Sequence, residues 1–121
     1  MFLELVATML ASHADLPRPP LEVHEAVRSW RDCVSDGLNR RAGLIRAGGD
    51  VHDLAGAILA ECRPQQDAAL AARARWLEAL DLSPGEAAVA LQRGERDVRS
   101  MRDSIILRAS RSTRDGNPDW E

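Results

Sequence analysis

The sequence predicts an all-α protein, an antiparallel three-helix bundle whose second helix is kinked near Pro64. Two observations lead to this prediction. Apolar residues recur at three- and four-residue steps from residue 21 to about residue 109, which is the spacing of helices that face a core. Glycine or proline interrupts this pattern near residues 48, 64 and 84, where a turn or a kink is expected. No stretch of the chain reads as a strand, and no internal repeat is present.

The length of 121 residues is typical of one domain with a modest core. We expect the helical bundle domain to span residues 21–110, with a flexible polar tail at residues 111–121. Residues 1–20 would form a leader or a short N-terminal helix, followed by a Pro-rich linker. All the basic residues are arginine and lysine is absent, as in proteins encoded by high-GC bacterial genomes. The net charge of −3 and the 3% aromatic content argue against a nucleic-acid partner.

The first twenty residues, MFLELVATMLASHADLPRPP, have two interpretations. In the first, the apolar run from Phe2 to Ala11 is an export signal, with Ser12 and Ala14 before a cleavage site. This run lacks a basic start and contains Glu4. In the second, the segment is a short amphipathic helix that belongs to the fold. The run is too short to span a bilayer, so we expect no transmembrane segment.

The first predicted helix starts after Pro20 and runs to about Ala47. Its apolar stripe consists of Val23, Val27, Trp30, Val34 and Leu38. Gly48 is suited to the left-handed conformation that ends a helix, and Asp50 is suited to cap the next one.

The second predicted helix begins at Val51, and its stripe continues through Leu54, Ile58 and Cys62. Pro64 either kinks a continuous helix or begins a new one. Because the stripe resumes after the proline and reaches Trp76, the pattern favours a kink.

The third predicted helix begins with a capping box, in which Ser83 and Glu86 satisfy each other's backbone N–H groups. Its expected core stripe is Ala87, Leu91, Gly94, Val98, Met101 and Ile105, and its expected end is near Ala109.

The two cysteines, Cys33 and Cys62, are predicted to form a structural disulfide. In an antiparallel hairpin, residues equidistant from the turn lie at the same height, and the midpoint between these two falls at Ala47 and Gly48. Both cysteines also lie on or beside the core-facing stripes, and small neighbours such as Gly37 and Gly56 would allow close packing. The alternative is a pair of buried thiols. A disulfide would indicate an oxidising compartment.

The segments WRDC, at residues 30–33, and AILAEC, at residues 57–62, resemble a group of small exported helical bacterial proteins of uncharacterised function. The resemblance covers about residues 21–80. It implies a leader peptide, an all-helical fold and a cysteine pair, and it implies no activity. This chain departs from the group in its leader and in the RPQQ segment after Cys62.

No catalytic constellation is apparent, and no cofactor is expected. The three histidines, His13, His24 and His52, do not converge with the cysteines at helical spacing, so no metal site is expected. No Cys-x-x-Cys pair, zinc-protease helix or phosphate-binding loop is present.

The arginines of the third helix are the remaining binding candidates. They recur every three residues among acidic residues, which is typical of a solvated face. The alternative is a surface for an acidic partner, with an exposed apolar residue that seats the N-terminal helix or a second subunit. The candidate partner-binding residues are Arg93, Arg96, Arg99, Arg102, Ile106 and Trp120.

These observations lead to the expectation of a non-catalytic protein with a binding or structural role in the cell envelope, periplasmic or secreted. Its partner would be an unknown protein or envelope component. The alternative is a cytoplasmic adaptor or small regulator that forms a homodimer through the third helix.

Overall fold

The structure is a computed structural model that describes residues 17–115 of the chain. Within this range the chain forms helices and no strand, so the predicted all-α class is confirmed. The helices are α2 (Leu21–Arg40), α3 (Ala42–Arg46), α4 (Val51–Glu61), α5 (Arg63–Ala79) and α6 (Pro84–Asp115). The sequence predicted three helices over this range, and the first two of them are each divided. None of the described helices is both long enough and apolar enough to cross a membrane.

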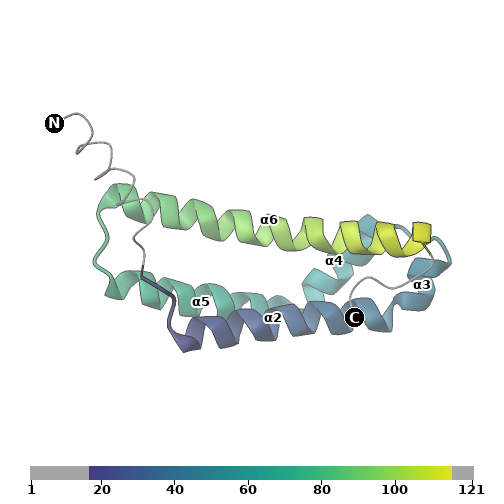
Figure 1. Cartoon of the computed structure of the whole chain (residues 1–121), viewed down its shortest axis with the longest axis horizontal. Helices are drawn as coiled ribbons and strands as arrows, with labels where there is room; N and C mark the ends of the chain where they lie inside the picture. Colours follow the sequence, from purple (N-terminus) through teal and green to yellow (C-terminus); the bar gives the residue numbers. More distant parts are fainter. Residues whose placement is uncertain (1–16, 116–121) are drawn as a thin grey trace.

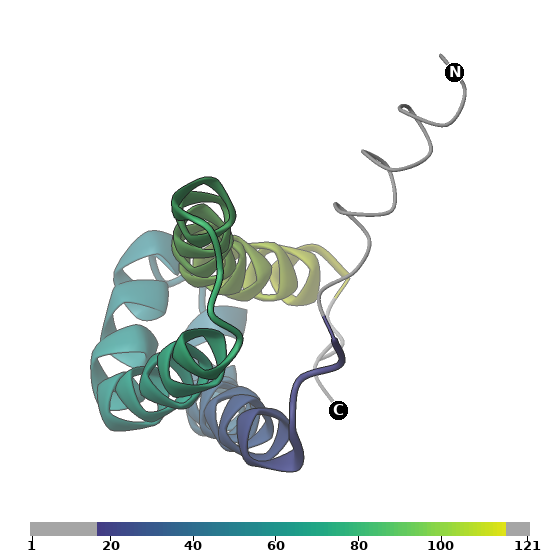
Figure 2. The ribbon, with the colours of Figure 1, turned by 90° about the vertical axis from the view of Figure 1, so that its left-hand side faces the viewer.

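Three of the helices run along the long axis of the molecule (Figure 1). α2 and α6 run in one direction, α5 runs in the opposite direction, and α3 and α4 lie towards the opposite end of the molecule from the start of α2. Viewed end-on, α2, α5 and α6 stand at three separate corners (Figure 2). α2 packs mainly against α5, whereas α6 packs mainly against α4 and α3. The first half of α6 is therefore less closely held than the second half.

The first predicted helix does not continue to Ala47, because it is interrupted at Arg41. This residue has a φ of −103° and a ψ of 9°, and its N–H donates to the Leu38 carbonyl at 3.1 Å in a tightened turn. The Arg41 guanidinium donates to the Gly37 carbonyl and to the Glu61 carboxylate, which stabilises the interruption. These bonds from Arg41, together with the nearby charge of Arg40, hold the pKa of Glu61 below its ordinary value.

The second predicted helix is divided into α4 and α5, so the prediction of a kinked continuous helix is wrong. Cys62 lies between them with a φ of −93° and a ψ of 12°. Pro64 has no N–H to donate, and its ring would clash with the carbonyl of residue 60 in a continuous helix. Proline is well tolerated in the first turn of a helix, so α5 begins anew at this position.

The predicted turn and cap residues behave as expected. Gly48 has a φ of +86°, and the Asp50 carboxylate accepts from the N–H groups of His52 and Asp53 at 2.9 and 3.2 Å. Ser83 and Glu86 form the reciprocal capping box at 3.1 and 3.2 Å. Hydrogen bonds from the Ser83 side chain and backbone lower the pKa of Glu86.

α6 extends to Asp115, beyond the predicted end near Ala109, so the first part of the predicted tail is helical. Neither glycine nor proline occurs between Gly94 and Gly116, and serine, threonine and arginine are compatible with a helix. The sequence estimate placed too much weight on the polar composition of this segment.

The hydrophobic core lies where α2, α4 and the second half of α6 meet. Its largest fully buried side chains are Val34, Leu38, Ile45, Ile58, Cys62 and Ile105. The predicted stripe of α6 is buried only in part: Ile105 is enclosed, whereas Ala87 is exposed and Leu91 is 68% exposed. Ala109, at the expected end of the helix, is also enclosed. The core of α6 therefore begins later in the helix than the sequence pattern suggested.

The two cysteines lie at disulfide distance, with their Cα atoms 5.8 Å apart. This bond links the middle of α2 to the junction between α4 and α5. Its sequence separation of 29 residues corresponds to a stabilisation of about 3–4 kcal/mol, relative to the reduced chain, in the chain-entropy treatment. One helical turn away, Gly37 lies so close to α4 that an added Cβ would be 2.9 Å from Cγ2 of Ile58. Gly56, in contrast, faces open space.

Alanine substitution should separate these two helical glycines. In Gly37→Ala, the clash with Ile58 should cost about 1–3 kcal/mol, which outweighs or cancels the gain in helix propensity. In Gly56→Ala, the same gain of about 0.5–1 kcal/mol should appear without a clash. Urea denaturation of oxidised protein would measure both free energies of unfolding. Equal stabilisation by both substitutions would contradict the close approach of α2 and α4.

Candidate functional site

A cleft of about 990 Å³ lies between the first part of α2, the second half of α5 and the first half of α6. The segment from Pro17 to Pro19 forms one edge of it, Arg73 and Trp76 contribute from α5, and Arg93 and Asp97 from α6. The cleft exists because α6 is packed against α3 and α4, and its first half stands away from α2. Its volume is at the upper end of the range for small-molecule sites.

Arginine dominates the charge of this cleft. The lining includes five arginines against three carboxylates, although the chain as a whole carries a net charge of −3. One arginine is neutralised, because Arg73 donates to Asp97 at 2.5 Å. Among the residues that the structure describes, the other four lining arginines have no ion-pair partner. They are Arg18, Arg28, Arg31 and Arg93.

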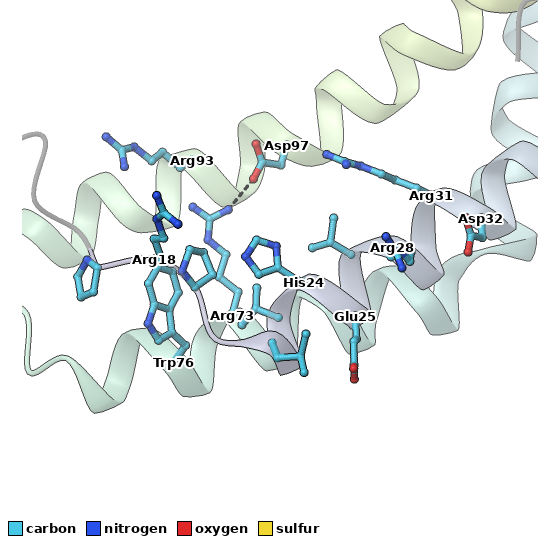
Figure 3. A pocket seen from close by; sticks show the side chains of 15 residues that line it. Arg18, His24, Glu25, Arg28, Arg31, Asp32, Arg73, Trp76, Arg93 and Asp97 are labelled. Carbon is cyan, nitrogen blue, oxygen red and sulfur yellow. Dashed lines mark hydrogen bonds and ion pairs between the residues drawn. The ribbon is translucent and has the colours of Figure 1, made fainter.

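Figure 3 shows how these side chains are arranged. Arg18, His24 and Arg31 extend into the space between α2 and α6, and the Arg73–Asp97 pair joins α5 to α6 on the far side of that space. Glu25 points away from α6. Of the four arginines without an ion-pair partner in the described part of the chain, Arg18 and Arg31 are directed into this space, whereas Arg93 points away from α2.

The α2 side of the cleft has two parallel stripes. Val23, which is 6% exposed, and the half-buried Val27 are four residues apart and face the interior. His24, Arg28 and Arg31 follow at steps of four and three residues and are exposed, so they lie along the rim. The half-buried indole of Trp76 adds an aromatic surface from α5. The cleft thus combines a cationic rim with an apolar floor.

Only one of the predicted partner-binding residues lines this cleft. Arg93 does so, whereas Arg96, Arg99 and Arg102 are exposed on α6 outside its lining. Ile106 is partly buried against the core and lies outside the lining of the cleft. Trp120 lies outside the described residues, and so does the segment 1–14 that was predicted as a leader.

Sequence reasoning missed the arginines of α2 and α5 and the role of Trp76. The available signal was the spacing of His24, Arg28 and Arg31, which places three basic side chains on one helix face. Arg18 and Arg73 have no comparable local signal, because only the packing of three helices brings them to the same space.

The chemical groups of the cleft are suited to binding. Within residues 17–115, no group of three histidine, cysteine, aspartate or glutamate side chains could hold a metal ion. Arginine remains protonated at every physiological pH, so it serves as a fixed donor to carboxylate or phosphate rather than as a general base.

A second, smaller concavity of about 250 Å³ lies between α5 and α6. Its lining is mostly apolar and includes Leu70, Leu77, Leu91 and Val98, with Arg73 and Glu95 as its charged residues. This apolar groove contains Leu91 and Val98, residues of the predicted α6 stripe that the core does not fully bury.

Comparison of the chain with protein-family models, with curated proteins and with solved structures found no match in any of the three.

Proposed function

We propose that this protein is a non-catalytic binding protein of the bacterial cell envelope that holds an anionic ligand in the cleft between α2, α5 and α6. The observation that carries this proposal is the excess of arginine over acidic residues in the lining of the cleft. Four of the five lining arginines have no ion-pair partner in the described part of the chain. In this proposal, α2, α4 with α5, and α6 serve as an antiparallel three-helix bundle that supports the site.

The proposed ligand charge follows from the chemistry of arginine. Grouped guanidinium groups repel one another, and an anion between them relieves that repulsion. Each guanidinium can donate two parallel hydrogen bonds to a carboxylate or phosphate. Because these arginines lie on the exposed rim, the strength of such bonds would come from charge and paired geometry rather than from exclusion of water.

The proposed location rests on the cysteine pair. Disulfides persist in exported proteins and are rare in the bacterial cytoplasm. The interpretation of residues 1–14 as a leader supports the same location, and these residues lie outside the described range.

Intact mass of the protein recovered from a bacterial host would test the location. We expect loss of residues 1–14, and alkylation of Cys33 and Cys62 only after reduction. A full-length chain with two freely alkylated thiols would contradict export.

Anion binding should depend on the cleft arginines and not on total charge. We expect Arg28→Gln/Arg31→Gln/Arg93→Gln to weaken binding of citrate or inorganic phosphate at least tenfold, because each lost charged hydrogen bond is worth about 1.5–3 kcal/mol. Calorimetric titration of the oxidised protein would measure the dissociation constants.

The matched control is Arg96→Gln/Arg99→Gln/Arg102→Gln, which removes the same number of charges from α6 outside the cleft. It should change the affinity less than twofold. Equal weakening by both triple variants would show that the attraction is unspecific, and absence of binding by the unmodified protein would refute the proposal.

The second candidate function is a cytoplasmic adaptor or small regulator that dimerises through α6, with residues 1–20 retained and both cysteines reduced. The apolar groove between α5 and α6 favours it, because Leu91 is 68% exposed there. An exposed apolar patch is typical of a surface that contacts another protein.

Leu91→Gln should distinguish this candidate. If the groove is a dimer interface, the substitution should raise the dissociation constant of the dimer about tenfold or more in sedimentation experiments, because a buried leucine contributes about 1.5–3 kcal/mol. Leu44→Gln, an exposed position on α3, is the control and should have no effect. A monomer at all concentrations would exclude the dimer.

A further inference from the structure

We infer that the ligand of the cleft is a single anionic amphiphile, with a carboxylate or phosphate head and an apolar chain. This inference rests on the proposed function and narrows its ligand class. It assigns the head group to the arginine rim and the chain to the apolar floor.

The first step is the division of the α2 surface. Positions 23 and 27 are separated by about one helical turn, as are positions 24, 28 and 31, so the two stripes run side by side along the helix axis. From Leu21 to Arg31 the axis rises by about 15 Å. Val23 and Val27 are about 6 Å apart along the axis, and His24 and Arg31 are about 10.5 Å apart, so a ligand that lies along α2 would contact valine on one side and basic side chains on the other.

The second step is the exposure of apolar side chains at the mouth of the cleft. Leu21 is 71% exposed although it lies at the start of α2 beside the cleft, and Trp76 is only half-buried. Pro17 and Pro19 lie at the same edge. These side chains provide an apolar surface that a small hydrophilic anion would leave in contact with water. An apolar chain would cover this surface and remove it from water, which favours binding.

The third step concerns the head group. Arg28 and Arg31 on α2 and Arg93 on α6 border the same cleft from two helices. Arg18 and Arg31 both extend into the space between α2 and α6, where their guanidinium groups can donate to a single anionic head group (Figure 3). The pair formed by Arg73 and Asp97 spans α5 and α6, so the Arg73 charge is already paired and the other lining arginines remain for the ligand.

A homologous series of amphiphiles provides the test. Butyl, hexyl, octyl and decyl phosphate, each below its micelle concentration, would be titrated into the oxidised full-length chain by calorimetry. Burial of one methylene contributes about 0.8 kcal/mol, so affinity should rise by up to about fourfold per methylene until the chain fills the cleft. The corresponding alkyl alcohols should bind at least tenfold more weakly than the phosphates.

Two variants should separate head from tail. Arg28→Gln/Arg31→Gln should lower the affinity for every alkyl phosphate of the series by a similar factor. The gain in affinity for each added methylene should remain unchanged. Leu21→Gln should reduce the gain in affinity for each added methylene without changing the affinity for inorganic phosphate. Leu107→Gln is the control for Leu21→Gln, because Leu107 is 51% exposed and lies outside the cleft.

The outcomes are distinct from those of the proposed function. If citrate and inorganic phosphate bind and affinity is independent of chain length, the amphiphile inference is overturned while anion binding stands. If neither salts nor amphiphiles bind, both proposals fail. Binding to vesicles that contain anionic phospholipid, without binding to free alkyl phosphates, would overturn the inference in favour of a membrane surface.

Discussion

The bond between Cys33 and Cys62 connects the two parts of the chain on which the remaining packing depends. It fixes the middle of α2 against the point where α4 ends and α5 begins. One turn further, the missing side chain of Gly37 lets Ile58 approach the α2 backbone, so the covalent link and the close contact set the same register. With this register in place, α5 extends along the first half of α2, and Arg73 and Trp76 reach the cleft.

The cleft follows from the two different ways in which the long helices are held. α5 is packed along α2, whereas α6 is packed along α3 and α4 at the opposite end. Because α6 is packed mainly against α3 and α4 rather than against α2, the first halves of α2 and α6 diverge from each other. The arginines of α2 and α6 line this divergence, because charged side chains are less costly beside a solvated opening than within a closed core.

The sequence was sufficient to predict those features that depend on local chemistry. The helical class, the left-handed Gly48, the cap at Asp50 and the Ser83–Glu86 box each follow from neighbouring residues. The cysteine pair was also predicted, because both cysteines are equidistant in sequence from the Ala47–Gly48 turn, and the breaks at Arg41 and Cys62 do not separate them. The breaks at Arg41 and Cys62 were not predicted, since hydrophobic periodicity continues across them and only tertiary contacts decide between a kink and a new helix. The cleft was missed for the same reason: Arg18, Arg73 and Arg93 are far apart in sequence, and the divergence of α6 has no local pattern.

The uneven support of α6 has a consequence for the dynamics of the protein. Its second half contributes Ile105 and Ala109 to the core, so opening of the helix at these two residues requires disruption of the core. Its first half has Ala90 as its one buried residue and is stabilised at its start by the capping box. Local opening of this half therefore requires less free energy than global unfolding. The protein thus has a wall of its cleft that can move independently of the disulfide-linked part, so the opening of the cleft can adjust without loss of the fold.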